Sequence, residues 1–411
     1  MRTAVLKREP SGRVPFHVSI AYMLTGFLVF FACIAGNTPP WRLKLSLVLI
    51  EVAILIGWAK LLSAGASAAP VTGQREIQAW MVGAMAALIL VHCGVAWRFV
   101  DNTSQWTDCF TFQRDAVVDL LHGVDPYGRT RPNIYNAQQT AQFYTPETES
   151  GGRVQVGMQY PPITFLCALP GYLMGDLRYG YVAAIALSAL FLFAAMPDGR
   201  GLALTIILLY NPITFFVEAF SWTEPLVWML LCATLYTALK RPKLLPLALG
   251  LFLASKQYNL IALPLLGYWL RDFEWRAYWR LVAGSLAVAA ATVLPFALWN
   301  FRALWHDLVW FHLAQPVRHD ELGFAAIFPL AMKFGPLLAL AFIASALLRG
   351  ARRPELFPAA YAMAMLIFVS TSKQAFLNYY FLIAQSLLLT GVVLWPERRA
   401  DVPKQAEPAS L

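Results

Sequence analysis

Apolar segments of bilayer length recur along the chain, and they constrain its fold more than any other feature. A helix of about 20 apolar residues is long enough to cross the hydrocarbon core of a membrane. Apolar residues make up 59% of the 411 residues and charged residues only 13%, and one water-soluble core cannot bury such an excess. We therefore expect an all-α polytopic membrane protein with about 11–13 transmembrane helices.

The apolar segments also predict how the chain is organised. We expect one transmembrane domain over residues 1–394, without internal repeats, and a disordered cytoplasmic tail over 395–411. The basic, apolar N-terminus is interpreted as an uncleaved first span. At 13 residues, segment 162–174 is too short to cross alone, so we expect it to dip into the membrane or lie at its surface. The predicted segments are 16–35, 45–62, 77–97, 162–174, 181–195, 202–217, 225–239, 244–254, 260–270, 281–299, 324–348, 356–369 and 376–394.

Lysine and arginine residues predict the orientation of these segments. The net charge is +9, and cytoplasmic loops of membrane proteins are enriched in basic residues. Basic clusters at the N-terminus and at 240–243, 271–280, 349–353 and 398–399 all fall on one side of the predicted topology. We therefore expect the long polar loops, 98–160 and 300–323, to face away from the cytoplasm, and we expect no nucleic-acid partner.

The first long loop contains an acidic segment directly after a predicted span. Read as a helix, residues 108–122 place Asp108, Asp115 and Asp119 near one face and valine and leucine residues on another. This pattern predicts an amphipathic helix at the membrane surface. Asp119 fits a solvated face. Asp108 fits such a face less well, because it lies at the N-terminal end of the helix, close to where Trp97 leaves the membrane.

A broken pair of short apolar segments supplies a candidate anion site. Segments 244–254 and 260–270 would each cover about 16 Å as helices, which is half a bilayer. The polar sequence between them contains Lys256 and Gln257. A lysine near the bilayer centre is costly and usually marks a functional site, so we expect Lys256 to lie in a pocket that binds an anion.

Several short motifs together resemble a known family. They are Asp108-x3-Phe112-x3-Ala116, then Leu121-x-Gly123-x-Asp125-Pro126-Tyr127, Tyr160-Pro-Pro-Ile163, and His312 followed by Pro316-Val-Arg-His-Asp320. The chain from residue 77 to 394 resembles the GT-C integral-membrane glycosyltransferases. It is most similar to the family 87-like branch that uses polyprenyl-phosphomannose. It departs from that branch in having two predicted spans, instead of one, before the helix that leads to Asp108.

This resemblance implies an inverting transfer of a sugar, mannose or another hexose, from a polyprenyl-phosphate donor to a lipid-linked or glycan acceptor. It implies Asp108 as the base, with Asp101 and Asp115 as the alternatives. It also implies a bacterial inner membrane as the location, with the long polar loops in the periplasm and membrane lipids as surroundings. No cofactor is identified, and a divalent cation is left open. The expected phosphate-binding residues are Lys256, Gln257, Arg318 and Lys373. The expected sugar- or acceptor-binding residues are Asp115, His122, Tyr127, Tyr160, Trp222, Glu218, Glu224, His312 and Asp320.

Alternatives stay open for some of these residues and for the activity. Arg318 could pair with Asp320, and Lys373 could extend to the membrane surface without binding substrate. A transporter or lipid flippase would share the hydropathy, as would a ligase or polymerase of surface polysaccharide. A transporter is expected to show repeats and paired interrupted helices, and the single broken pair favours an enzyme.

Overall fold

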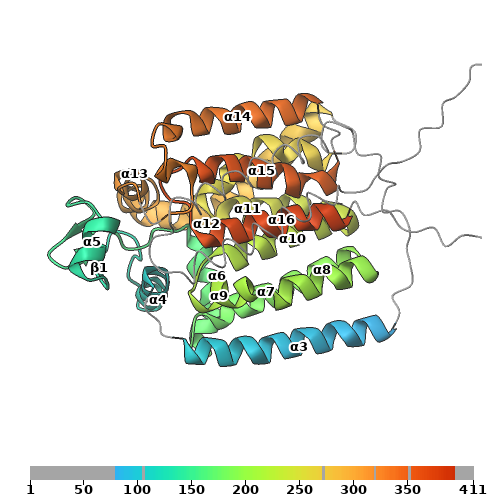
Figure 1. The fold of residues 1–411 in the computed structure, drawn as a ribbon, viewed down its shortest axis with the longest axis horizontal. Coiled ribbons are helices and arrows are strands. Elements are labelled where there is room, and N and C mark those ends of the chain that lie inside the picture. The colour runs from blue at the N-terminus through green and yellow to red at the C-terminus, as the bar shows by residue number, and fades with distance from the viewer. Residues whose placement is uncertain (1–78, 104–106, 271–273, 319–320, 350–352, 394–411) are drawn as a thin grey trace, which may run out of the picture.

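Helices make up about three quarters of the described chain (Figure 1). The computed structural model describes residues 79–103, 107–270, 274–318, 321–349 and 353–393. The strands within these ranges form one three-stranded sheet, with two residues in each strand. The predicted all-α class is therefore confirmed for the described residues. The predicted spans 16–35 and 45–62, the tail 395–411 and Asp320 lie outside them.

Three helical segments are long and apolar enough to cross a membrane. They are α3 (Ala79–Asn102), the segment Trp275–Ala314 that begins with α12 (Trp275–Trp305), and α14 (Ala331–Arg349). Within their most apolar windows only 22–28% of the residues are buried inside the protein. Water would strongly disfavour so much exposed apolar surface, so this pattern is typical of helices that contact lipid.

Tryptophans on α12 mark the edges of an apolar belt. Trp279 and Trp299 are 59% and 47% exposed, and at 1.5 Å per residue they lie about 30 Å apart. This separation matches the hydrocarbon thickness of a bilayer, and tryptophan is enriched at both membrane–water interfaces. Trp80 and Trp97 lie near the two ends of α3 and are also exposed. Both helices therefore fit one membrane region.

A bend divides the predicted span 202–217. Helix α8 (Gly199–Tyr210) and helix α9 (Pro212–Ala219) meet at an angle of 55°. Pro212 has no backbone N–H to continue α8, and its ring clashes with the preceding turn. The side chain of Asn211 instead caps α9 by accepting a hydrogen bond from the Ile213 N–H at 3.0 Å.

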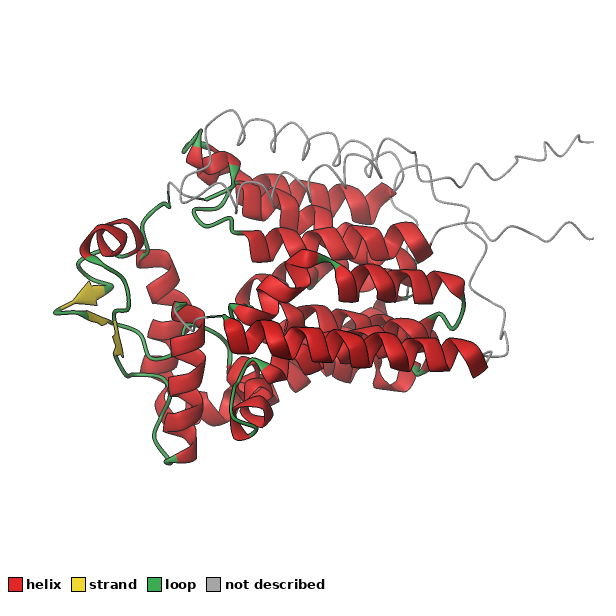
Figure 2. Cartoon of the chain, turned by 60° about the horizontal axis from the view of Figure 1, so that its bottom comes forward, coloured by secondary structure: helices red, strands yellow, loops and turns green. Residues whose placement is uncertain are grey.

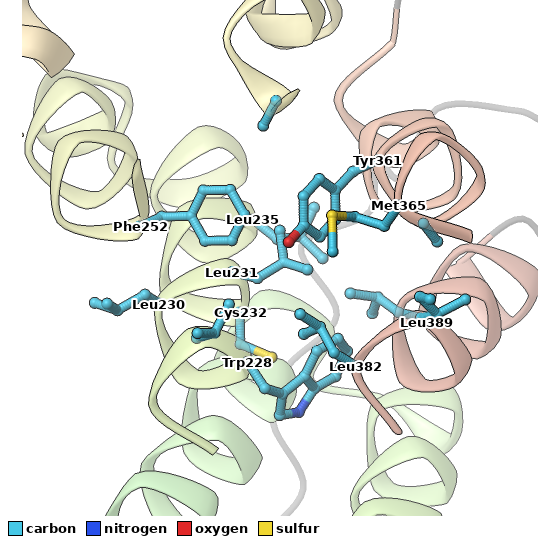
Figure 3. Packing of buried hydrophobic residues seen from close by; sticks show 14 of the residues in the cluster. Trp228, Leu230, Leu231, Cys232, Leu235, Phe252, Tyr361, Met365, Leu382 and Leu389 are labelled. Atoms are coloured by element: carbon cyan, nitrogen blue, oxygen red, sulfur yellow. The ribbon is translucent and has the colours of Figure 1, made fainter. Parts of the chain in front are cut away.

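The interior of the bundle is packed with large apolar side chains (Figure 3). Trp228, Phe252, Tyr361 and Leu382 are each at most 2% exposed and belong to one core cluster from four helices. Burial on this scale holds together helices that are too short to be stable alone. The helices of this central group are α7 (Tyr179–Ala195), α10 (Glu224–Lys240), α11 (Leu245–Ser255), α15 (Phe357–Ser370) and α16 (Leu377–Val393).

Three predicted spans differ from the observed elements. Segment 260–270 is not an α-helix but part of two 3-10 stretches, Gln257–Ala262 and Pro264–Trp269, because Pro264 cannot donate a backbone hydrogen bond. The span expected over 281–299 is longer, since α12 ends at Trp305 and leads into a π-helix, His306–Trp310, and α13 (Phe311–Ala314). The span expected from 324 contains a 3-10 turn, Phe324–Ala326, before α14.

A small lobe extends beyond one end of the bundle (Figures 1 and 2). It contains α5 (Ala137–Phe143) and the strands β1 (Arg131–Pro132), β2 (Glu149–Ser150) and β3 (Arg153–Val154). The strand order is β1-β3-β2, with Arg131 and Glu149 both paired to Val154. Helix α4 (Asp108–Leu121) lies between this lobe and the bundle, which confirms the helix predicted there. We call this the α4 end.

Helix α6 (Pro162–Leu173) does not cross the bundle. It follows Tyr160, which contacts Cys109 on α4. Arg178, just before α7, donates to the carbonyl of Thr103, which follows α3, and to that of Ala219 at the end of α9. Both flanks of α6 therefore lie at the α4 end, as its short length predicts.

The contact between α11 and α12 gives a test of this packing. A Cβ atom at Gly250 would lie 2.5 Å from the Ser285 carbonyl oxygen and 2.5 Å from the Val288 Cβ. We expect Gly250→Leu to separate the helices and to cost at least about 1–3 kcal/mol of stability, measured as a lower unfolding midpoint in detergent. Gly94→Leu is the control, because a Cβ there would have no neighbour within 4 Å. Equal midpoints for the two variants would contradict the packing.

Candidate functional site

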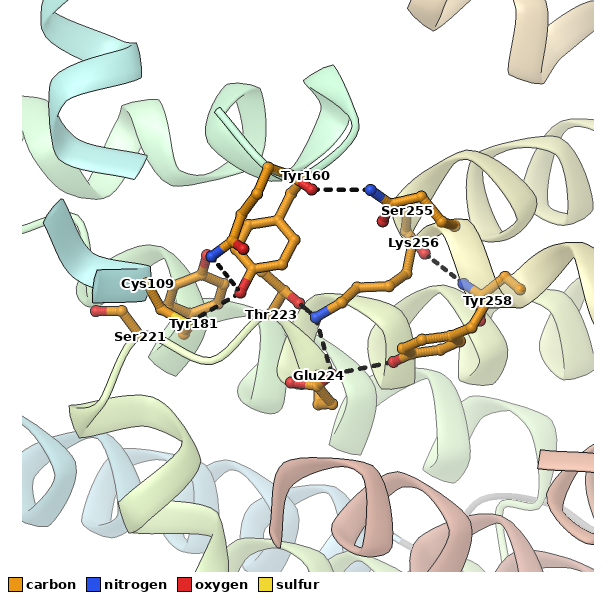
Figure 4. Close-up of polar contacts among 12 residues, drawn as sticks. Cys109, Tyr160, Tyr181, Ser221, Thr223, Glu224, Ser255, Lys256 and Tyr258 are labelled. Atoms are coloured by element: carbon orange, nitrogen blue, oxygen red, sulfur yellow. Dashed lines mark hydrogen bonds and ion pairs between the residues drawn. The ribbon is translucent and has the colours of Figure 1, made fainter. Parts of the chain in front are cut away.

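A cluster of polar side chains surrounds Tyr160 at the α4 end (Figure 4). Tyr160 is buried, its hydroxyl lies 3.0 Å from the Cys109 Sγ, and its ring centroid lies 4.4 Å from the Lys256 Nζ. The contributing elements are α4, the segment before α6, the start of α10 and the end of α11. We call Asp108, Cys109, Tyr160, Glu224, Lys256 and Tyr258 the Tyr160 cluster.

Lys256 enters this cluster because α11 stops early. Helix α11 ends at Ser255, and the backbone of Lys256 is extended, with φ −158° and ψ 146°. The buried ammonium group donates to the Thr223 hydroxyl and to Glu224 Oε1, the latter at 3.1 Å. It also lies 5.6 and 5.7 Å from the ring centroids of Tyr258 and Tyr379. The ammonium is therefore held by one carboxylate, one hydroxyl and three aromatic rings.

Glu224, the first residue of α10, is the acidic partner of Lys256, and the sequence around Lys256 does not predict this pairing. Its side chain is fully buried, and Oε1 also accepts a hydrogen bond from the Tyr258 hydroxyl at 3.0 Å. Among the described residues, Oε2 has no hydrogen-bond partner. A buried carboxylate oxygen without a partner is costly, so Glu224 can still accept a hydrogen bond from a ligand hydroxyl.

Asp108 joins this chain of contacts through its neighbour Cys109 on α4. It is the first residue of α4, after the N-cap Thr107, and its carboxylate accepts the Cys109 N–H at 2.7 Å. The helix N-terminus favours negative charge there. Burial raises the pKa of the Tyr144 and Tyr160 phenols, and the nearby charge of Asp108 adds to both shifts. The half-buried acid and the buried cation thus belong to one cluster.

Two further predicted cations lie in loops: Arg318 follows α13, and Lys373 lies between α15 and α16. The Arg318 guanidinium lies 3.5 Å from the ring centroid of Phe143 in the lobe and 4.7 Å from that of Phe376. Lys373 Nζ donates to the carbonyls of Leu313 and Gln315 at 2.7 and 2.6 Å, and burial lowers the pKa of this lysine. Arg318 therefore joins the lobe to the bundle, and Lys373 holds the end of α13.

The segment Gly157–Tyr160 is fixed by side chains from several elements. Gln257 and His312 both contact the Gln159 carbonyl, at 2.8 and 2.9 Å, and the Tyr127 hydroxyl donates to the Tyr160 carbonyl at 2.8 Å. These three predicted site residues therefore act on the backbone that carries Tyr160.

The same segment depends on two residues that the sequence analysis did not select. Asp307, in the π-helix, is buried and accepts the N–H groups of Gly157 and Met158 at 2.9 and 3.0 Å. Its available signal was a carboxylate flanked by large apolar residues within the predicted loop 300–323. Gly157 is required by close approach, since a Cβ there would lie 2.3 Å from the Pro126 carbonyl oxygen.

Four predicted residues are not brought to the cluster. Asp115 pairs with its neighbour Arg114 at 2.8 Å. His122 is exposed and contacts the Val118 carbonyl of its own helix. The alternative base Asp101 accepts hydrogen bonds from Trp97 and Tyr179. Glu218 is buried between helices and contacts His92 at 2.9 Å.

Trp222 lies in the turn that separates Glu218 from Glu224. It is partly buried and packs against the core cluster of the bundle and against a second apolar cluster that contains Phe112 and Tyr127. Its ring centroid lies 5.6 Å from that of Phe220. Its neighbour Ser221 has φ +58°, the one positive value among the described non-glycine residues. Such a conformation costs on the order of 1–3 kcal/mol and persists only when its surroundings enforce it. This turn directs the two glutamates to different partners.

The buried ion pair gives a test of the site geometry. Lys256→Met or Glu224→Gln leaves one polar partner buried without its counterpart, which costs about 3–5 kcal/mol. The double variant removes both charges and is expected to lose less than the sum of the single losses. Unfolding of all three variants in detergent measures the coupling. Additive losses would show that the two side chains do not interact.

A surface pair provides the matched control. Arg114 and Asp115 are partly exposed, so neutralising either should change stability by at most about 1 kcal/mol.

The cluster thus combines a half-buried carboxylate, a buried lysine–glutamate pair and several tyrosines at one end of apolar helices. Among the described residues, no group of three histidine, cysteine or acidic side chains could hold a metal ion. No protein-family model, curated protein or solved structure matches the chain.

Proposed function

We propose that this protein is an integral-membrane glycosyltransferase that moves a sugar from a polyprenyl-phosphate donor to a lipid-linked or glycan acceptor. One observation carries the proposal: Tyr160 contacts both Cys109, the neighbour of Asp108 on α4, and Lys256, the partner of Glu224, at one end of the apolar helices. A donor of this kind has an apolar tail, an anionic phosphate and a polar sugar. The cluster offers each part a suitable environment.

The phosphate is the part that needs positive charge. Lys256 and Arg318 are the cations placed to attract it, and the Gln257 amide lies next to Lys256 in sequence. Charged hydrogen bonds to phosphate are stronger than neutral ones. Lys256 is shared with Glu224, so donor binding is proposed to draw the ammonium group partly away from that carboxylate.

The sugar is the part that needs hydrogen-bond acceptors. Glu224 Oε2 is buried and has no partner among the described residues, so it can accept a sugar hydroxyl. Tyr160 and Tyr258 supply rings and hydroxyls around the same carboxylate. The proposed sugar is mannose or another hexose.

The reaction requires a base for the acceptor. Asp108 takes the proton of the acceptor hydroxyl while that oxygen attacks the anomeric carbon from the face opposite the phosphate. The bond between the anomeric carbon and the phosphate oxygen breaks, and polyprenyl phosphate leaves. The sugar is now attached to the acceptor, with inverted configuration at its anomeric carbon. Cations near the departing phosphate stabilise the negative charge that develops on it.

The proposed location is a bacterial inner membrane with the α4 end in the periplasm. Lys240 and Arg241 end α10 at the opposite end from Glu224, and Lys243 follows directly. Arg276 and Arg280 lie in the first turns of α12. Basic residues on the side away from Asp108 are typical of the cytoplasmic face.

A reconstituted transfer assay tests the proposal. Asp108→Asn is expected to lower kcat by on the order of 10²–10⁴-fold, because the variant cannot take the acceptor proton, while donor binding is retained. Purified protein in lipid discs, with a polyprenyl-phosphate sugar and a lipid acceptor, gives both readouts. Glu147→Gln is the control, since Glu147 is an exposed carboxylate in the lobe next to α4.

Three results would contradict parts of this proposal. Undiminished transfer by Asp108→Asn would remove Asp108 as the base, and loss with Asp115→Asn instead would move the role there. Movement of the lipid across the membrane without sugar transfer would replace the enzyme with a transporter or flippase.

A further inference from the structure

The turn before Glu224 is held by side chains from outside it. Arg178 donates to the Ala219 carbonyl at 3.3 Å, and the Thr107 hydroxyl donates to the Phe220 carbonyl at 2.9 Å. Gln113 Nε2 donates to the carbonyl of Ser221 at 2.8 Å. These three hydrogen bonds hold the consecutive carbonyls of Ala219, Phe220 and Ser221, the last of which is the residue with the positive φ angle. The surrounding helices therefore enforce this backbone conformation.

Gln113 differs from Arg178 because it also fixes the helix that carries Asp108, as the N-cap Thr107 does, and it differs from Thr107 because it also accepts a hydrogen bond from α7. Its side chain is completely buried on α4. Nε2 donates to the Cys109 carbonyl at 2.9 Å as well as to Ser221, and Oε1 accepts the Tyr181 hydroxyl of α7. One amide thus links the first turn of α4, the turn before Glu224 and α7.

We propose that Gln113 is a positioning residue that sets Asp108 in register with the Glu224–Lys256 pair. This inference rests on the glycosyltransferase proposed above. A neutral amide is suited to the role because it donates two hydrogen bonds and accepts another at the same site. An ionised glutamate would present only acceptors to the two carbonyls, and an apolar side chain would leave them without their donor.

The register matters because Asp108 and Glu224 act on different molecules. Glu224 and Lys256 hold the donor, whereas Asp108 takes a proton from the acceptor. A shift between α4 and the turn therefore changes the distance between base and acceptor without removing a donor contact. Misplacement of about 1 Å can cost on the order of 100-fold in rate.

The test separates kcat from the donor KM. Gln113→Met retains the side-chain length but forms no hydrogen bond through an amide. We expect kcat to fall at least tenfold while the donor KM changes by less than threefold. Tyr181→Phe, which removes only the bond to Gln113 Oε1, is expected to give a smaller loss of kcat with the same unchanged KM. It also provides the second variant if Gln113→Met does not fold.

Gln385→Met is the matched control. Gln385 is also a buried helical glutamine, on α16, and its Nε2 has no hydrogen-bond partner among the described residues. Its kcat is expected to equal that of the wild type.

The outcomes distinguish the two proposals. Wild-type transfer combined with normal kcat in Gln113→Met and Tyr181→Phe would overturn the positioning role and leave the glycosyltransferase intact. Loss of kcat only in proportion to the folded fraction would also overturn it, as would a parallel rise in KM. Absence of transfer by the wild type would overturn both proposals.

Discussion

A lysine and a glutamate buried between α10 and α11 form the interaction on which the site depends. Burying either charge alone is expensive, so Lys256 and Glu224 must be brought together as the bundle forms. This contact forms where α11 ends early, because the chain leaves the helix after Ser255 and is extended at Lys256. The tyrosines around the ammonium are then placed by the same packing, and the site becomes part of the folded core.

The site also depends on how the lobe is attached to the membrane helices. Helix α4 contributes Asp108 at its first turn and Gln113 on its buried face, so one short helix carries both the proposed base and an attachment to the bundle. The Arg318 side chain makes a second connection, because it contacts Phe143 of the lobe and Phe376, which directly precedes α16. Polar groups from distant parts of the sequence thus meet where the apolar helices end.

Local patterns predicted much of this arrangement, and long-range contacts account for what they missed. The spacing of acidic and apolar residues predicted α4, and segment length predicted that α6 does not cross. The pairing of Glu224 with Lys256 could not be predicted, because the two glutamates near Trp222 looked equivalent in sequence. The left-handed backbone of Ser221 separates them. Asp307 was missed because its partners are backbone N–H groups almost 150 positions away.

The close contact at Gly157 has a consequence for variation among related sequences. In the segment 157–160, side chains of other elements bond the N–H groups of Gly157 and Met158 and the carbonyls of Gly157, Gln159 and Tyr160. Substitution tolerance there should therefore follow the crowding around the main chain, not the chemical character of each side chain. A library of variants would show alanine excluded at a position that performs no chemistry.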